Sequence, residues 1–218
     1  MMSFSMWDII RNLLIGGGLT LLLSAAAFVL GGLAGLLVLF ARIAKHRPPR
    51  GLAQIYIELF QGTPLLLQLF TLYFGLSLFG LDIPAWLAAG LGLMLFTSAY
   101  LAEIWRGCVE AVPRGQGEAS ASLAFSYREQ MQHVILPQAA RMAIAPTVGF
   151  AVQVVKGTAV TSIIGFAELT KTGSMIANAT YQPFLVYSLV AIGYFLLRYP
   201  LSWSAQRLER RLHAPRSH

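Results

Sequence analysis

The residues with the clearest binding potential are polar side chains inside long apolar stretches of the sequence. Lys156 and Thr158 lie in one such stretch, which runs from about residue 142 to 164. A charge within a membrane-spanning segment is costly and usually faces a cavity or a partner. The Lys156 ammonium could therefore attract a substrate carboxylate, to which Thr158 could donate a hydrogen bond. The alternative is that Lys156 snorkels to water from near a helix end.

A second polar feature interrupts the apolar stretch from about residue 55 to 79. Gly62, Thr63 and Pro64 break the helical pattern there. Non-helical backbone at membrane depth is tolerated only where protein or a water-filled cavity surrounds it, and broken spans commonly build transport sites. A simple proline kink is the alternative, and Glu58 could face the neighbouring loop instead of a pore. The candidate pathway residues are Glu58, Gly62, Thr63, Pro64, Gln68, Lys156 and Thr158.

A third feature is the polar interruption from residue 103 to 141. It carries a run of small side chains that suits close packing in a groove on another protein: Ala119, Ser120, Ala121, Ser122 and Ala124. Ser126 and Glu129 have the spacing of a capping box. The pattern predicts two short helices joined by a bend near 124–126, with the second ending where Pro137 breaks or redirects the chain. An amphipathic connector lying on a membrane surface is the alternative.

The composition is that of a membrane protein. Of the 218 residues, 56% are hydrophobic and 11% charged, and the mean hydropathy is +0.64, whereas soluble domains average about 25% charged residues. No charge occurs between Arg11 and Arg42, a longer interval than the ~20 apolar residues that a membrane helix needs. We expect an all-α polytopic protein with one domain over residues 1–218. Its five spans are expected at about 13–40, 55–79, 85–102, 142–164 and 184–204, with the polar loop at 103–141.

The basic residues are distributed unequally between the two sides of this topology. One side holds Arg42, Lys45, Arg47, Arg50, Arg106, Arg114, Arg128, Arg141 and a basic tail that includes Arg216, whereas the other holds Arg11 and Lys171. The positive-inside rule therefore predicts an external amino terminus and a cytoplasmic carboxyl terminus. It also accounts for the net charge of +7 without nucleic acid. An aromatic belt would place Trp7 and Trp86 at the outer interface, and Trp105 and Trp203 at the inner one.

Two connecting segments and the reactive groups complete the expectations. The segment from Arg42 to Arg50 reads as a short rigid loop and that from Glu168 to Pro183 as a polar connector, with Glu168 solvated or capping a helix. The single cysteine, Cys108, excludes an internal disulfide and offers no metal cluster. The chain lacks a glycine-lysine loop of the Walker type, so we expect ATP to bind elsewhere. We expect no catalytic residue, no metal and no cofactor.

The polar loop resembles the cytoplasmic loop of bacterial ATP-binding-cassette importer permeases, which reads Glu-Ala-Ala, three residues, Gly, nine residues, Ile, one residue, Leu-Pro. Glu118-Ala119 and Leu136-Pro137 match this pattern in register. Ser120 replaces the second alanine, Ala124 replaces the glycine and Val134 replaces the isoleucine. Outside the loop, Gln61-Gly62-Thr63-Pro64-Leu65-Leu66 resembles the Arg-Gly-Thr-Pro-Leu-Leu segment of the polar-amino-acid branch. Lys156-Gly157-Thr158 stands where that branch reads Lys-Asp-Thr.

The resemblance implies the membrane-spanning subunit of an ATP-driven amino-acid importer in the bacterial inner membrane. Its loop would form a coupling helix docked on a cytoplasmic ATPase through Glu118, Ala119, Ser120, Ala124, Leu136 and Pro137. The implied partners are two ATPase subunits that bind the ATP, an extracytoplasmic binding protein, a small polar amino acid, and a second permease subunit. Because Gly157 lacks a carboxylate for the substrate ammonium, we favour a homologous second subunit over an identical one, with Glu58 as the other source of the acid.

Three other functions are compatible with parts of the pattern. One is a permease of the same importer class for another small polar solute. The second is a secondary transporter, which would need ion ligands within spans and usually has inverted repeats. The third is a structural assembly factor, which would need neither a broken span nor a charge in a span. A neighbouring reading frame for an ATPase and a secreted binding protein would distinguish the importer from the last two.

Overall fold

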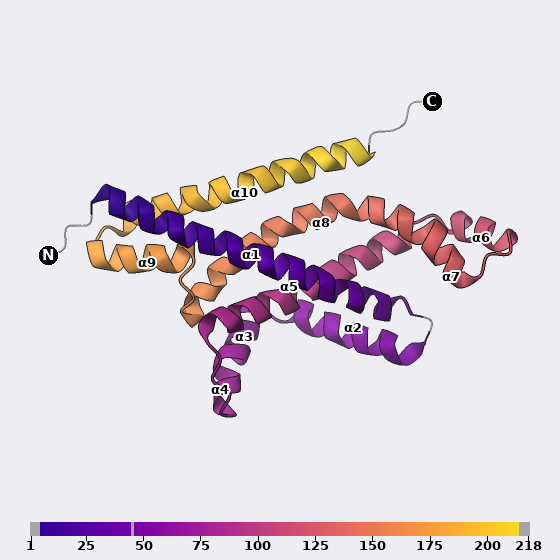
Figure 1. Ribbon diagram of the computed structural model, residues 1–218, viewed down its shortest axis with the longest axis horizontal. Helices are drawn as coiled ribbons and strands as arrows, with labels where there is room; N and C mark the ends of the chain where they lie inside the picture. The colour runs from indigo at the N-terminus through magenta and orange to yellow at the C-terminus, as the bar shows by residue number, and fades with distance from the viewer. Residues whose placement is uncertain (1–4, 45, 214–218) are drawn as a thin grey trace.

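The structure, a computed structural model, describes residues 5–44 and 46–213, so Lys45 and Arg216 lie outside it. Within these residues all regular structure is helical (Figure 1). Four helical stretches are long and apolar enough to cross a membrane, and a bent pair makes a fifth. This confirms the all-α fold with five spans. The long helices are α1 (Met6–Arg42), α5 (Ala85–Glu110), α8 (Leu136–Thr158) and α10 (Pro183–His213).

The first span packs closely on α5 because glycines bring the two backbones together. α1 begins at a capping box between Ser5 and Asp8 and runs beside α5 in Figure 1. A Cβ added to Gly31 would lie 2.7 Å from Thr97 Cβ, and one added to Gly35 would lie 3.0 Å from the Ser98 carbonyl oxygen. This glycine pair therefore permits the close helix approach that small residues favour within membranes.

The broken span consists of α2 (Arg47–Gly62), α3 (Leu65–Phe70), the π-helical η1 (Thr71–Gly75) and α4 (Leu76–Leu78), with a bend of 104° at the break. Pro64 has no N–H, so it cannot donate to the Phe60 carbonyl as a helical residue would. The Gln68 side chain supplies the missing donor: its Nε2 donates to Phe60 O at 2.8 Å and to Thr63 O at 3.0 Å. The break is thus stabilised by a buried amide.

Two expectations about the connecting segments are wrong. Residues 47–50 belong to α2, because Pro48 and Pro49 occupy the first helical turn, where a missing N–H costs nothing. The polar connector contains a further helix, α9 (Leu169–Thr180), which η3 (Ala159–Ile164) joins to α8.

We expected Glu168 to be solvated or to cap a helix. It caps α9, and its side chain is fully buried rather than solvated. Its Oε1 accepts from Lys171 N and its Oε2 from Thr170 N, both at 2.8 Å. The Tyr194 hydroxyl donates to the same Oε2 at 2.6 Å. The carboxylate therefore joins α9 to α10 and satisfies the orphan amides at the start of α9.

The polar loop is largely helical. α5 continues to Glu110, and Arg106 forms ion pairs with Glu103 and Glu110 along this extension. The two short helices are α6 (Arg114–Ser122) and α7 (Tyr127–Glu129), and α7 begins at the expected capping box of Ser126 and Glu129.

Pro137 does not end the second of these helices, contrary to our expectation. The chain continues from α7 through the π-helical η2 (Gln130–Ile135) directly into α8. Leu136 N donates to the Met131 carbonyl, one residue further back than in an α-helix. This wider turn relieves the clash that a proline ring makes with the preceding turn, so α7 and α8 form one bent unit.

Candidate functional site

The loop site is built on the end of α6. Phe125 N donates to Ser120 O at 3.1 Å and Ala124 N donates to Ala121 O at 2.9 Å, the bond pair of a Schellman motif. Ala124 occupies the left-handed position of this motif, with φ of 64°. This conformation explains why the family pattern has a glycine at this position, because a Cβ strains a left-handed backbone. The chain therefore keeps the bend at some cost in stability.

Replacing Ala124 by glycine should stabilise the loop. Removing the Cβ from the left-handed backbone should lower the free energy of the folded loop by about 1 kcal/mol. The amides of α6 and Phe125 should therefore exchange hydrogen more slowly in Ala124→Gly. The matched control is Ala121→Gly, within α6, where glycine costs about 0.5–1 kcal/mol and exchange should accelerate. Faster exchange in Ala124→Gly would contradict the strain assigned to this residue.

The predicted loop residues do not share one surface. Glu118, Ala119, Ala124 and Pro137 are exposed, whereas Ser120 is buried and its hydroxyl donates to the Gly117 carbonyl at 2.8 Å. Leu136 lies at the base of the loop and lines an apolar groove. Of the predicted loop residues, the side chains that reach the surface are therefore those of Glu118, Ala119, Ala124 and Pro137.

The structure shows two further exposed apolar side chains on the loop. Leu123 is 73% exposed and Phe125 is 37% exposed at the tip of the loop. Sequence reasoning missed both, although two large apolar residues beside a small-residue run in a polar loop were the available signal. Aromatic and aliphatic anchors of this kind carry much of the energy of protein interfaces.

The structure brings the broken span and the Lys156 segment together. A Cβ added to Gly157 would lie 3.2 Å from Leu65 Cδ2 and 3.1 Å from Leu93 Cδ2, and Leu65 directly follows Pro64. The break and the segment of α8 that carries Lys156 are thus neighbours in space. An aspartate at position 157 would point into this apolar contact rather than toward the Lys156 side of α8.

Lys156 and Thr158 face different ways. Thr158 is fully buried and its hydroxyl donates to the Val155 carbonyl at 2.8 Å, so in this conformation it supports the helix rather than an exposed surface. Lys156 is exposed, and Gln153, one turn earlier, is exposed on the same face. Gln153 was not among the sequence candidates, although a polar residue three positions from Lys156 was readable as a shared helix face.

The residues of the broken span also divide into exposed and structural ones. Glu58 is exposed on α2 and accepts a hydrogen bond from Gln54 Nε2 at 2.8 Å. Gly62 is exposed beside the break. Thr63 donates to the Leu59 carbonyl at 2.7 Å, and Gln68 is buried and holds the break as described above. Glu58 is therefore the one exposed acid among the candidate pathway residues.

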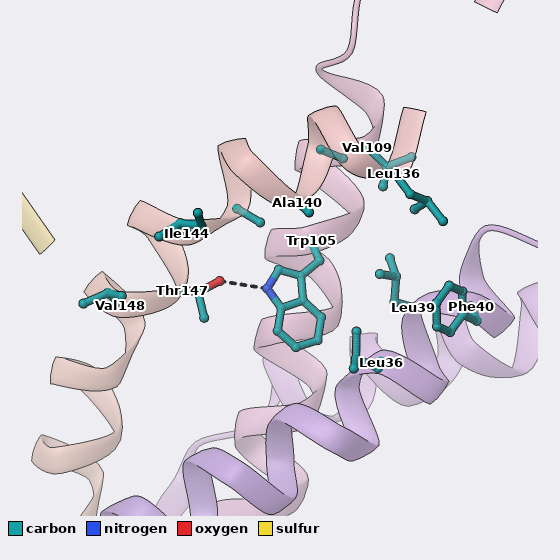
Figure 2. Close-up of a pocket in the computed structure, with 12 residues that line it drawn as sticks. Leu36, Leu39, Phe40, Trp105, Val109, Leu136, Ala140, Ile144, Thr147 and Val148 are labelled. Carbon is teal, nitrogen blue, oxygen red and sulfur yellow. Dashed lines mark hydrogen bonds between the residues drawn. The ribbon is translucent and has the colours of Figure 1, made fainter. Parts of the chain in front are cut away.

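The Trp105 side chain lies between α5 and α8 (Figure 2). Its indole Nε1 donates to the Thr147 hydroxyl on α8 at 2.8 Å, beside an apolar groove of about 480 Å³ formed by α1, α5 and α8. The other three tryptophans, Trp7, Trp86 and Trp203, are 68%, 62% and 52% exposed, as expected of a belt. Trp105 thus tethers the two helices that carry the loop.

A bundle of membrane helices with a broken span, and with a helical loop between two of the spans, is an arrangement in which transport proteins commonly build their pathway. The chain belongs to the family described as binding-protein-dependent transport system inner membrane component, which matches residues 29–214. This confirms the resemblance seen in the loop. Membership implies a multi-pass inner-membrane protein that works with an ATPase and a binding protein.

Relatives and a solved structure cover nearly the whole chain. It is 35% identical over 193 residues to the probable glutamine ABC transporter permease protein GlnM of Bacillus subtilis, covering 88% of this chain and 89% of the relative. It is 34% identical over 215 residues to the glutamine transport system permease protein GlnP of Escherichia coli, covering 95% and 96%. The crystal structure of an amino acid ABC transporter with histidines superposes with a TM-score of 0.90 at 35% identity, covering 96% of this chain and 100% of the other.

Proposed function

We propose that this chain forms one wall of the translocation pathway of an ATP-driven amino-acid importer. The observation that supports the proposal is the close approach of Gly157 to Leu65, because Leu65 follows the break and Gly157 follows Lys156 in the chain. Lys156 attracts the carboxylate of the cargo and Gln153 offers it hydrogen bonds. The amino-acid relatives support this cargo class, and another small polar solute is the alternative.

The loop transmits the motion of the ATPase to the pathway. α6 lies between the end of α5 and the α7–η2 segment that continues into α8, and α8 carries Lys156. The Gln138 side chain donates to Gln116 Oε1 at 3.4 Å, and Trp105 joins α5 to α8. A displacement of α6 therefore moves both helices together, and the groove beside Trp105 leaves room for α8 to shift against α1.

The loop side of the bundle is cytoplasmic in this proposal, with the amino terminus outside, because basic residues favour the cytoplasm. A reporter fused after Arg50 should therefore be cytoplasmic, and one inserted in α9 near Thr180 should be external. Alkaline phosphatase, active only outside, and green fluorescent protein, fluorescent inside, are complementary readouts. Phosphatase activity after Arg50 would reverse the topology.

Two ATPase subunits bind the ATP, and a second permease subunit completes the pathway. The Gly157 geometry removes the main reason for requiring a different second subunit, because an acid there would not reach the Lys156 face. Glu58 is exposed on α2 and is a source of the acid for the cargo ammonium within this chain. We therefore propose that an assembly of two identical chains is sufficient, in contrast to the heteromer that the sequence favoured.

The test is reconstitution of the permease with the ATPase and binding protein encoded beside it. Vesicles containing the complex, with ATP inside, should accumulate an amino acid presented with the binding protein. The control is the same complex with an ATPase that cannot hydrolyse ATP. Uptake that persists with this control and follows an ion gradient instead would support a secondary transporter and overturn the proposal.

A further inference from the structure

Arg198 is a cation in the last span that the proposed pathway does not use. It lies in the stretch of α10 that is apolar enough to cross a membrane. Among the side chains that the structure describes, its buried Nε has no hydrogen-bond partner, and no carboxylate forms an ion pair with it. A guanidinium stays charged in proteins, and a charge within a span needs a cavity or a partner. A compensating anion must therefore come from outside the described chain.

Arg198 lines a hollow on one side of α10 that the other described helices leave open. The hollow measures about 630 Å³, and the residues that line it all belong to α10. This helix lies along one edge of the bundle in Figure 1, and 11% of its most apolar window is buried, against 50% for α5. In a membrane, the side of α10 with the hollow therefore faces lipid or another subunit.

The lining of the hollow changes from apolar to polar along the helix. Ala191 and Phe195 lie at one end, Ser202 and Gln206 lie at the other, and Arg198 lies between them. The stretch from residue 191 to residue 206 is about 22 Å long at about 1.5 Å per residue. One leaflet, half of a bilayer of about 40–45 Å, has the same thickness. A phospholipid matches both the length and the polarity of the hollow, whereas a small solute matches neither.

Aromatic side chains place the polar end of the hollow at the membrane surface. Tyr199 and Trp203 line the hollow and are 59% and 52% exposed, as residues of an interfacial belt are. The Arg207 Cζ lies over the Trp203 ring, 4.9 Å from its centroid. The backbone of Arg198 lies five residues before Trp203, about 8 Å deeper, and long cationic side chains bridge such depths by snorkelling to the interface. The two arginines therefore lie on either side of the headgroup level.

Charge argues against a second copy of this chain as the occupant of the hollow. In a pair related by a two-fold axis along the membrane normal, an interface on this side would place Arg198 beside its own counterpart at the same depth. Like charges repel, and Glu209, the one acid in the sequence of α10, lies eleven residues away, about 16 Å along the axis. A phosphate, by contrast, accepts strong charge-assisted hydrogen bonds from a guanidinium.

We propose that the hollow on α10 binds an anionic phospholipid from the leaflet on the side of the carboxyl terminus. Arg198 donates to the lipid phosphate, and the side chains of Ser202 and Gln206 bond the polar headgroup. The acyl chains lie along Ala191 and Phe195. A lipid with a net negative charge, such as phosphatidylglycerol, compensates the guanidinium, whereas phosphatidylcholine is neutral and attracts it less. This inference goes beyond the proposed function and does not depend on the cargo.

The test titrates the delipidated permease–ATPase complex in detergent with phosphatidylglycerol or phosphatidylcholine and measures the first lipid bound per permease chain by native mass spectrometry. Phosphatidylglycerol should bind at least about 10-fold more tightly, as expected of one hydrogen-bonded contact with a charged group. In Arg198→Met this preference should disappear, whereas Arg198→Lys should keep most of it. The matched control is Arg50→Met, which removes an exposed cation from α2 and should leave the preference unchanged.

Several results would overturn the inference. Equal affinity of the native complex for the two lipids would do so, and this comparison needs no variant. An unchanged preference in Arg198→Met would place the lipid elsewhere. A disulfide between two permease chains that carry Ser202→Cys and Cys108→Ser would assign this side of α10 to a second subunit. Displacement of phosphatidylglycerol by a free amino acid would assign the hollow to the pathway.

Discussion

Uptake of the amino acid should fall by about 30-fold or more in Lys156→Met, because losing one partner of a desolvated charge pair costs at least about 2 kcal/mol. The side chain is exposed in this single chain but lies in a membrane span beside the break, so its charge is available to the cargo. Methionine keeps the length and apolar stem. Initial rates of ATP-driven uptake in vesicles, with assembly checked by co-purification, measure the effect.

The matched control for Lys156 is Lys171→Met on α9. The Lys171→Met substitution also removes one positive charge, but Lys171 lies outside the proposed pathway. Its hydrogen bond to Glu168, which caps α9, is made by the backbone N–H and does not depend on the side chain. Uptake should stay within about twofold of native in this variant, because surface substitutions away from special features usually shift free energies by no more than about 0.5 kcal/mol. Equal losses in the two variants would remove Lys156 from the site.

The second large effect is expected at the loop, where Ala119→Arg should prevent the ATPase from docking. Ala119 is exposed on α6, so an arginine there leaves the fold intact and projects into the partner. Overpacking a close interface costs about 1–3 kcal/mol or more, which weakens the complex by about 5- to 150-fold. Co-purification of the ATPase subunit and stimulation of its ATP hydrolysis measure the loss.

Ala119→Ser controls for size at the same position, since a hydroxyl adds little volume and should preserve docking. A contrasting case is Ser120, which is buried within the loop, so Ser120→Arg should damage α6 itself and lower the yield of folded permease. Normal ATPase binding together with normal uptake in Ala119→Arg would show that α6 docks elsewhere or not at all.

Local signals in the sequence determined much of this protein. The spans follow from hydropathy over windows of about 20 residues, and the broken span follows from Pro64, whose missing N–H acts on its own turn. The capping box of Ser126 and Glu129 is likewise confirmed, because its hydrogen bonds join residues three positions apart. The loop motif, read from residue types and spacing alone, led to the correct family.

Only the tertiary structure decided which way the side chains of each span point. Neighbours in a helix differ by about 100° in direction, so Lys156, Gly157 and Thr158 face an open side, the Leu65 contact and the interior, respectively. The sequence analysis assigned Lys156 and Thr158 to one site, although the two side chains point in different directions. These directions are set by packing against helices far away in the chain, which no local window contains.

The same limit explains the hydrogen bond of Trp105. A tryptophan near a span end reads as an interface anchor, and only the approach of Thr147 from α8 shows that its indole has a partner inside the bundle. Composition and spacing determine the membrane fold and its family, whereas long-range helix packing determines which way the side chains of each span point.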